Sequence, residues 1–294
     1  MKLEEIDLTQ SSLYRKGFPH EIFSQLREEA PVWRHPETPG LEETGGESFW
    51  VLSRYEDIRA ANRDAETFLS KGGAGLGYEG NGLMLTDMDG QPHIRQRKLI
   101  SSGFTPRMTK RLEGLAREWA VKLVDEAIER ESVEFVNDVA YQLPMHMIAD
   151  VLGIPLEDRD WLFAITNDML LCIDPEHPVP VSERESLAAQ VFGYGQKVSA
   201  AKRKTPTDDV LSTLVTVEDD LGRLNELELD AFFMLLTVAG SETTRNAIAS
   251  GLHQLLMEPE QLAALRSDPG PLKGATEETS RWTSPVASFQ RIVR

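Results

Sequence analysis

One long segment constrains the fold more than any other part of this 294-residue chain. Asn225 begins it with a capping-box pattern that is completed by Glu228, three residues later. Glu258-Pro259 ends it, so we predict one helix from about Glu226 to Met257. At 1.5 Å per residue the helix is about 45 to 50 Å long. A helix of this length crosses a whole domain.

A polar run interrupts this predicted helix in its most apolar part. The run Ala239-Gly240-Ser241-Glu242-Thr243-Thr244-Arg245 places polar groups where each unpaired one costs about 1 to 3 kcal/mol on burial. Ala239 and Gly240 carry little or no side chain, so a flat molecule could lie against the backbone there. Two interpretations stay open. The run is either a helix kink, with threonine hydroxyls bonded back to carbonyls, or a functional site.

Composition limits the classes of protein to which the chain can belong. Its 48 acidic and 31 basic side chains give a net charge of −17, which argues against a nucleic-acid or anionic-membrane binder. The first twenty residues carry no apolar run, and no stretch reaches the roughly 20 apolar residues that a bilayer requires. We therefore expect a cytoplasmic protein without a membrane span.

The other patterns along the chain are mostly helical. Two short apolar stretches at 32–34 and 48–52 predict a β-hairpin. Apolar spacing of the helical kind predicts further helices at 19–29, 55–68, 111–130, 141–152, 157–171, 182–204, 208–215, 259–267 and 271–282. The predicted fold class is mainly α with a minor β-sheet (α+β), in a single domain over residues 1–294.

A Gly-rich stretch matches the dinucleotide-binding fingerprint in letters only. Gly75, Gly77 and Gly80 have the required spacing, but a predicted helix precedes them where the fingerprint needs a strand. A loop is favoured over a nucleotide site. Its apolar side chains are Leu76, Tyr78, Met84 and Leu85.

A basic cluster stands out on this acidic chain. His93 and Arg97 lie four residues apart, on one face of a predicted helix, and could jointly bind a carboxylate or phosphate. No acidic residue occurs between Asp89 and Glu113. The basic residues of this stretch are Arg95, Arg97, Lys98, Arg107, Lys110 and Arg111. A solvated basic face is the alternative, and a nucleic-acid surface is not favoured because no aromatic platform accompanies the charges.

Two residue types that often carry chemistry receive structural interpretations. Cys172 is the single cysteine, which excludes an internal disulfide and a zinc cluster of several thiolates. His146 lies in an apolar helical stretch, where a hydrogen-bonded core histidine is favoured over a metal ligand.

Three motifs in fixed order resemble the cytochrome P-450 family of haem-thiolate monooxygenases, in particular its soluble bacterial members. Ala239-Gly240-Ser241-Glu242-Thr243-Thr244 matches A-G-x-[DE]-T-[TS] of the family's oxygen-activating helix. Glu278-Thr279-Ser280-Arg281 matches its E-x-x-R, and His93 to Arg97 matches its H-x-x-x-R. Each motif alone is weak, but their shared order and spacing cover nearly the whole chain.

The resemblance implies a haem b site. His93, Arg97 and Arg291 would bind the haem propionates, while Ala239 and Gly240 would let the porphyrin and dioxygen lie against the helix. A substrate pocket would be lined by Leu76, Tyr78, Met84, Leu85 and Val238.

The resemblance also implies roles for two acidic residues and their partners. Thr243 and Glu242 would deliver protons to iron-bound dioxygen. Glu278 and Arg281 would form a buried ion pair behind the haem, where the loss of one partner leaves an unpaired charge.

The chain departs from the family pattern in one element, the iron-ligand cysteine loop. The family's iron ligand is a cysteine in an F-x-x-G-x-x-x-C-x-G loop downstream of E-x-x-R, and no such loop occurs up to Arg294. Cys172 lacks this Gly-rich setting and is not expected to replace it. We therefore expect a chain truncated before its haem-ligand segment and inactive by itself.

The implied function is a haem-dependent monooxygenase that inserts one oxygen atom from O2 into a C–H bond of an apolar molecule. The motifs look most like members that oxidise steroid side chains or terpenoids. A ferredoxin-type electron donor would dock on the basic stretch from Arg95 to Arg111. The alternative, from a different class, is a haem-free, non-catalytic remnant of such an enzyme.

Overall fold

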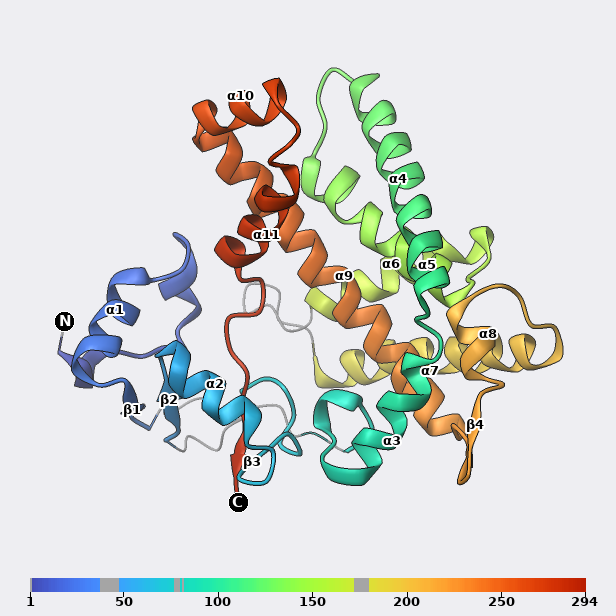
Figure 1. Cartoon of the computed structure of the whole chain (residues 1–294), viewed down its shortest axis with the longest axis horizontal. Coiled ribbons are helices and arrows are strands. Elements are labelled where there is room, and N and C mark those ends of the chain that lie inside the picture. Colours follow the sequence, from blue (N-terminus) through green and yellow to red (C-terminus); the bar gives the residue numbers. More distant parts are fainter. Residues whose placement is uncertain (1, 38–47, 77–79, 81, 172–179) are drawn as a thin grey trace. The chain divides into compact units, whose positions relative to one another are not determined.

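Helices dominate the computed structural model, which describes residues 2–37, 48–76, 80, 82–171 and 180–294 (Figure 1). The α-helices are α1 His20–Glu29, α2 Tyr55–Arg63, α3 Gly90–Ser101, α4 Pro106–Ile128, α5 Gln142–Leu152, α6 Leu156–Leu171, α7 Val181–Lys204, α8 Val210–Leu214, α9 Glu226–Met257, α10 Pro259–Ser267 and α11 Leu272–Thr283. Short helical turns add η1 Leu3–Glu5, η2 Ser11–Tyr14, η4 Leu85–Asp87 and the π-helical η5 Val136–Ala140. The predicted fold class is confirmed.

The described strands form three small antiparallel sheets of two strands each. The predicted hairpin is confirmed by β1 (Val32–Arg34) and β2 (Trp50–Leu52). A second sheet pairs β3 (Phe68–Leu69) with β6 (Ile292–Val293), which are distant in sequence. The third pairs β4 (Glu218–Asp219) with β5 (Gly222–Arg223).

Two compact units make up the chain. The first unit contains Met1–Ile94 and Ser288–Arg294, and the second contains Arg95–Ala287. The boundary falls inside α3, so His93 belongs to the first unit and Arg97 to the second. The single domain over residues 1–294 stays a prediction.

The first unit has its own apolar cluster under α1. Ile6, Leu26 and Trp33 are buried together there, at 1%, 0% and 8% exposure. Buried His35 ties the N-terminal segment to this cluster, since its Nε2 accepts a hydrogen bond from the Leu8 amide at 2.9 Å.

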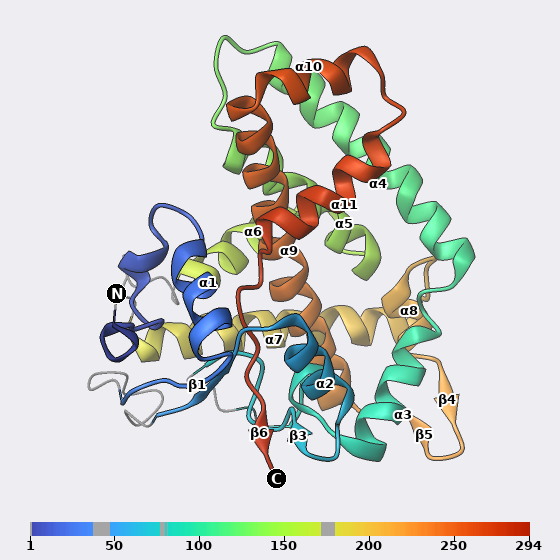
Figure 2. The same ribbon diagram turned by 60° about the vertical axis from the view of Figure 1, so that its left-hand side comes forward.

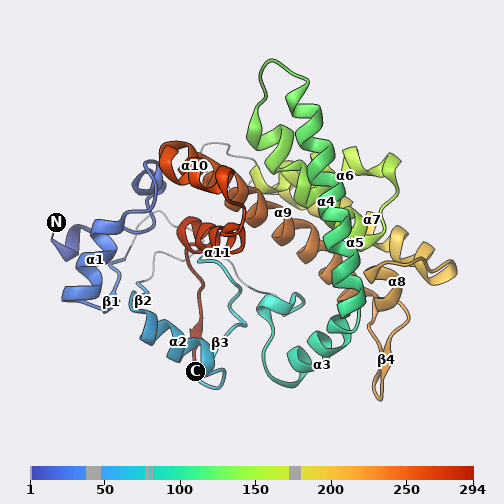
Figure 3. The same ribbon diagram turned by 45° about the horizontal axis from the view of Figure 1, so that its top comes forward.

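In the second unit, α9 is the central element. It packs against α5, α7 and α11, and Figure 2 and Figure 3 show it running the length of that unit. The capping box is formed as predicted, with Asn225 Oδ1 accepting from the Glu228 amide at 2.9 Å and Glu228 Oε2 accepting from the Asn225 amide at 2.8 Å. Both ends of the predicted helix are confirmed. None of the described helices is long and apolar enough to cross a membrane.

The core of the second unit forms where other helices meet the first half of α9. Phe233 and Leu229 of α9 are fully buried, as are Met145 of α5 and Val191 of α7. Full burial of a large apolar side chain contributes about 1.5 to 3 kcal/mol. This packing anchors the half of α9 that precedes the polar run.

Candidate functional site

Three hydroxyl groups in or just before the polar run of α9 bond back to carbonyls within the helix. Thr237 Oγ1 donates to the Phe233 carbonyl at 2.8 Å, and Ser241 Oγ lies 3.1 Å from the Thr237 carbonyl. Thr243 Oγ1 donates to the Ala239 carbonyl at 2.9 Å. The hydrogen bonds from hydroxyls to preceding carbonyls, which the helix-kink interpretation predicts, are therefore present. They leave the functional interpretation open, because Ser241 is fully buried whereas Thr243 is only half-buried.

Ala239 and Gly240 face different surroundings. A Cβ atom on Gly240 would lie 3.0 Å from Cδ1 of Ile148 on α5, so the glycine permits close contact between α9 and α5. Ala239 is exposed. Of the two residues predicted to lie against a porphyrin, Ala239 has open space beside it and Gly240 has a packing partner.

Glu242 lies beside Arg245, the last residue of the polar run, and this pairing was not predicted. Its Oε1 is 3.9 Å from Nη2 of Arg245, and their side chains are 37% and 17% exposed. The Arg245 guanidinium lies 5.7 Å from the ring centroid of Tyr141. Burial raises the pKa of Tyr141 to about 12, and its hydroxyl donates to the Phe163 carbonyl at 2.6 Å. The i, i+3 spacing of Glu242 and Arg245 was the available signal.

The three predicted propionate-binding side chains make no ion pair with the carboxylates of the described residues. His93 and Arg97 lie one turn apart on α3. Arg291 directly precedes β6, and its Nη1 donates to the Gln290 carbonyl at 2.7 Å. The structure brings His93 and Arg291 into one unit. Basic side chains that pair with no described carboxylate, on a chain of net charge −17, are suited to an anionic ligand.

The Glu278–Arg281 ion pair forms, but its predicted burial is wrong. Arg281 Nε and Nη2 donate to the two Glu278 oxygens at 2.7 and 2.6 Å, and these hydrogen bonds lower the pKa of Glu278. The side chains are 59% and 66% exposed. The physical reason is the rotation of α11, which packs on α9 through Thr279 against Gly251 and turns the pair outward.

The basic stretch is only partly available as a docking surface. Arg95 is 20% exposed and pairs with Asp219 at 3.1 Å and with Glu228 at 3.4 Å. Arg111 pairs with Asp208 at 2.7 Å. The exposed basic residues without an ion pair to any described carboxylate are Arg97, Lys98, Arg107 and Lys110.

The predicted substrate-pocket residues are divided between the units. Leu76, Met84 and Leu85 lie in the first unit, and Leu76 is 38% exposed. Val238 is half-buried on α9 in the second unit. Tyr78 and Cys172 lie outside the described residues.

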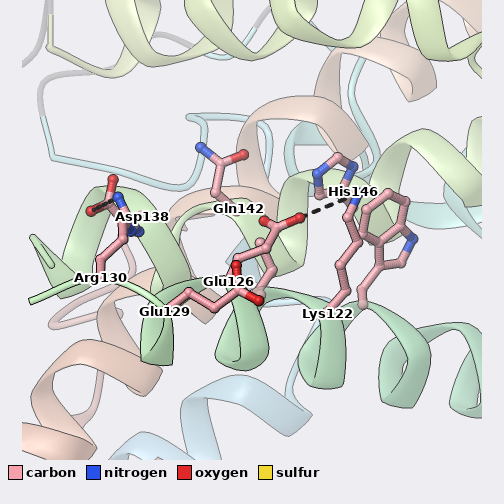
Figure 4. Close-up of a pocket in the computed structure, with 9 residues that line it drawn as sticks. Lys122, Glu126, Glu129, Arg130, Asp138, Gln142 and His146 are labelled. Atoms are coloured by element: carbon pink, nitrogen blue, oxygen red, sulfur yellow. Dashed lines mark ion pairs between the residues drawn. The ribbon is translucent and has the colours of Figure 1, made fainter.

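A polar pocket of about 600 Å³ lies over α4 and α5, and no predicted site residue lines it (Figure 4). His146 lines it, stacked on Trp119 with 3.6 Å between ring centroids. Burial, followed by the nearby charge of Arg159, lowers the pKa of His146 to about 4, so the ring is neutral. The core role is consistent with this stacking, but the buried Nδ1 makes no hydrogen bond to any described residue, so the expected hydrogen bond is missing there.

The rim of this pocket is held by ion pairs between neighbouring side chains. Lys122 and Glu126 lie 3.8 Å apart, and Arg130 and Asp138 lie 3.0 Å apart (Figure 4). No group of three or more histidine, cysteine, aspartate or glutamate side chains suited to a metal occurs in the part of the chain that the structure describes.

Known proteins resemble the chain along almost its entire length. No family model matches it. A steroid C26-monooxygenase of Rhodococcus jostii is 33% identical, over 98% of this chain and 62% of that protein. Cytochrome P-450 126 of Mycobacterium tuberculosis is 39% identical, over 98% of this chain and 72% of that protein. The chain thus spans less than two thirds of the length of the first relative.

Solved structures share the fold. A Mycobacterium marinum cytochrome P-450 in complex with pseudoionone has a TM-score of 0.85 and 32% identity, covering 98% of this chain and 73% of its own. A Bacillus megaterium structure in complex with testosterone has a TM-score of 0.79 and 26% identity, covering 94% of this chain and 70% of its own.

Proposed function

The chain belongs to the cytochrome P-450 family, and we propose that it functions as a haem-dependent monooxygenase that inserts one oxygen atom from O2 into a C–H bond of an apolar substrate. The observation that supports this most is the face of α9 on which exposed Ala239 lies one turn before Thr243, with Glu242 beside it. A small residue next to a hydroxyl and a carboxylate suits a helix that borders a flat cofactor and handles protons.

Haem is the cofactor of this family, and the residues present fit it. Two propionates need cationic or N–H donors, which His93, Arg97 and Arg291 can supply because none is paired with a described carboxylate. Ala239 leaves room beside α9, whereas Gly240 serves the contact with Ile148. No residue of the chain is assigned as the iron ligand, because Cys172 lacks the Gly-rich setting of the family's ligand cysteine.

When bound, haem supplies the activation of dioxygen. The chain's own residues would bind the propionates and manage protons. Thr243 Oγ1 carries a proton that now points to the Ala239 carbonyl, and rotation about χ1 would redirect it away from the backbone. Glu242 is 37% exposed, so its carboxylate can exchange protons with solvent. Its Oε1 lies 3.9 Å from Nη2 of Arg245.

We propose a steroid or terpenoid as substrate. Relatives are named as steroid C26-monooxygenases, and solved structures contain pseudoionone and testosterone. A methyl-branched lipid omega-hydroxylase of Mycobacterium bovis is also 35% identical over 65% of its length. The molecules in these names are all largely apolar and carry few polar groups.

Electrons would come from a ferredoxin-type donor. Arg97, Lys98, Arg107 and Lys110 offer an exposed basic surface to an acidic partner. We further propose that both units belong to a single cytochrome P-450 domain and that the protein is cytoplasmic.

Haem reconstitution followed by turnover under labelled O2 tests the proposal. For the chain extended by the family's cysteine loop, haem uptake and one labelled oxygen atom in a steroid or terpenoid product are the expected result. Protein that folds but takes up no haem would support the haem-free remnant instead. A thiolate-type Soret band from residues 1–294 alone, in the reduced carbonyl-bound form, would contradict the expectation that this chain lacks the iron ligand.

A further inference from the structure

Asp89 joins the start of α3 to the end of β3. Its Oδ1 accepts the Ser70 amide at 2.8 Å and its Oδ2 accepts the Lys71 amide at 2.9 Å. A carboxylate that receives two consecutive backbone N–H groups makes two charge-assisted hydrogen bonds, roughly twice as strong as neutral ones. Asp89 is half-buried and directly precedes Gly90, the first residue of α3.

Gln290, two residues before β6, binds the loop from Ser70 to Ala74 as well. Its backbone N–H donates to the Ala74 carbonyl at 3.0 Å, and its side-chain Nε2 donates to the Gly72 carbonyl. A Cβ atom on Gly72 would lie 2.6 Å from Cγ1 of Ile292, so only glycine permits this approach of β6. The loop from Ser70 to Ala74 is thus bound to α3 by Asp89 and to β6 by Gln290.

We propose that Asp89 and Gln290 are positioning residues for the haem propionates. Asp89 lies four residues before His93, and Gln290 directly precedes Arg291. Both links run through the loop from Ser70 to Ala74, and all of these residues belong to the first unit. The inference rests on the proposed function, because it assumes that His93 and Arg291 bind propionates.

The physical reason is preorganisation. Two donors that meet two carboxylates of fixed separation bind best when their own spacing is already set, because less backbone freedom is lost on binding. Neither His93 nor Arg291 is held by an ion pair to a described carboxylate. The spacing of their backbones is therefore set by the elements that carry them, and Asp89 and Gln290 join those elements.

Asp89→Asn is a sharp test because it preserves shape. An amide side chain keeps one acceptor oxygen but turns an NH2 group toward the second backbone N–H, where a donor then faces a donor. Asp64→Asn is the matched control. It removes the same charge in the same unit from a side chain whose hydrogen bonds are local, from the Thr67 amide at 3.0 Å, the Thr67 hydroxyl and the Glu66 amide.

The first arm of the test needs no haem. Amide hydrogen exchange in the haem-free protein is expected to become about tenfold faster at Ser70 and Lys71 in Asp89→Asn, with amides of α9 unchanged. Asp64→Asn is expected to leave Ser70 and Lys71 unchanged. Equal exchange at these two amides in Asp89→Asn and wild type would overturn the inference.

The second arm measures haem dissociation from the loaded protein. We expect Asp89→Asn and Gln290→Leu each to speed haem loss about tenfold, with little change in far-UV circular dichroism. In a His93→Ala/Arg291→Ala background, Asp89→Asn is expected to add nothing, since it acts through those residues. An equal acceleration in that background would show a merely structural role and refute positioning.

The two arms separate the failure of this inference from the failure of the proposed function. Wild-type protein that takes up no haem refutes the function, and the positioning role with it. Faster exchange in the first arm would then still establish the link between Asp89 and the loop from Ser70 to Ala74.

Discussion

The Thr243 hydroxyl donates to the Ala239 carbonyl at 2.9 Å, so the residue proposed to move protons is bonded to the residue proposed to border the cofactor. The hydrogen bond satisfies the hydroxyl when no ligand is near. It joins the Thr243 side chain to the backbone of Ala239 on the same α9 face, where Ala239 is exposed and Thr243 half-buried. The structural and functional interpretations of the polar run are therefore compatible.

We predict that Thr243→Ala retains haem and substrate but diverts electrons to peroxide or water, because the proton on Oγ1 is lost. Product formed per electron consumed is the measurement. Stability should change by only about 0.5 kcal/mol, as is usual for a partly exposed position. Thr244→Ala, at the exposed neighbouring position, is the matched control and should stay coupled. Unchanged coupling in Thr243→Ala would refute proton delivery.

Gly251→Ala should destabilise the second unit by about 1 to 3 kcal/mol, because the new Cβ would overlap the Cγ2 methyl of Thr279 on α11. Thr279→Ser removes that methyl, so the double variant should regain most of the loss. Urea unfolding of both single variants and the double variant measures the coupling. Additive effects would mean that α9 and α11 do not meet at this point.

Glu278→Ala should change the thermal midpoint little, because the ion pair with Arg281 is exposed. Its hydrogen bonds lower the pKa of Glu278, so the small contribution is present at neutral pH and is lost as pH falls through that lowered pKa. Thermal unfolding at low and high salt is the measurement. Loss of the folded protein would restore the original prediction of a buried pair.

Unfolding free energy should fall as pH drops from about 6.5 to about 4, because His146 is neutral when folded and has a pKa lowered to about 4. In this pH range the unfolded state binds a proton at His146 that the folded state does not bind. His146→Phe keeps a ring against Trp119 and should flatten this part of the pH profile in urea unfolding. His253→Gln, at an exposed position, is the control and should preserve it. A wild-type profile in His146→Phe would contradict the assignment.

Substitutions in the basic stretch should distinguish its exposed basic residues from the ion-paired Arg95. Lys98→Glu and Arg107→Glu should slow electron transfer from an acidic ferredoxin, with a weaker effect at high salt, because both side chains are exposed. Arg95→Gln should instead lower stability by about 1 to 3 kcal/mol, since it leaves Asp219 and Glu228 without their partner. Stopped-flow reduction and urea unfolding distinguish them. Slower electron transfer in Arg95→Gln at unchanged stability would place Arg95 in the docking surface.

Local chemistry was enough to predict most of the helices and the β1–β2 hairpin, but not the other short strands or the end of α2 at Arg63. The bounds of α9 follow from Asn225, Glu228 and Pro259, because caps and helix breakers act within a few residues. The family motifs were likewise visible as short spacings, which pointed to Glu242, Thr243 and the pairing of Glu278 with Arg281.

Burial and distant partners were decided by the tertiary structure. The i, i+3 spacing determined that Glu278 and Arg281 would pair, but the contact of Thr279 with Gly251 decided that they face solvent. Arg95 belonged to a basic stretch by sequence, yet its partners Asp219 and Glu228 lie more than a hundred residues away. The sequence by itself determined which groups are close along the chain. Which face of a helix is covered, and which charges are neutralised, depends on packing between segments that no local pattern encodes.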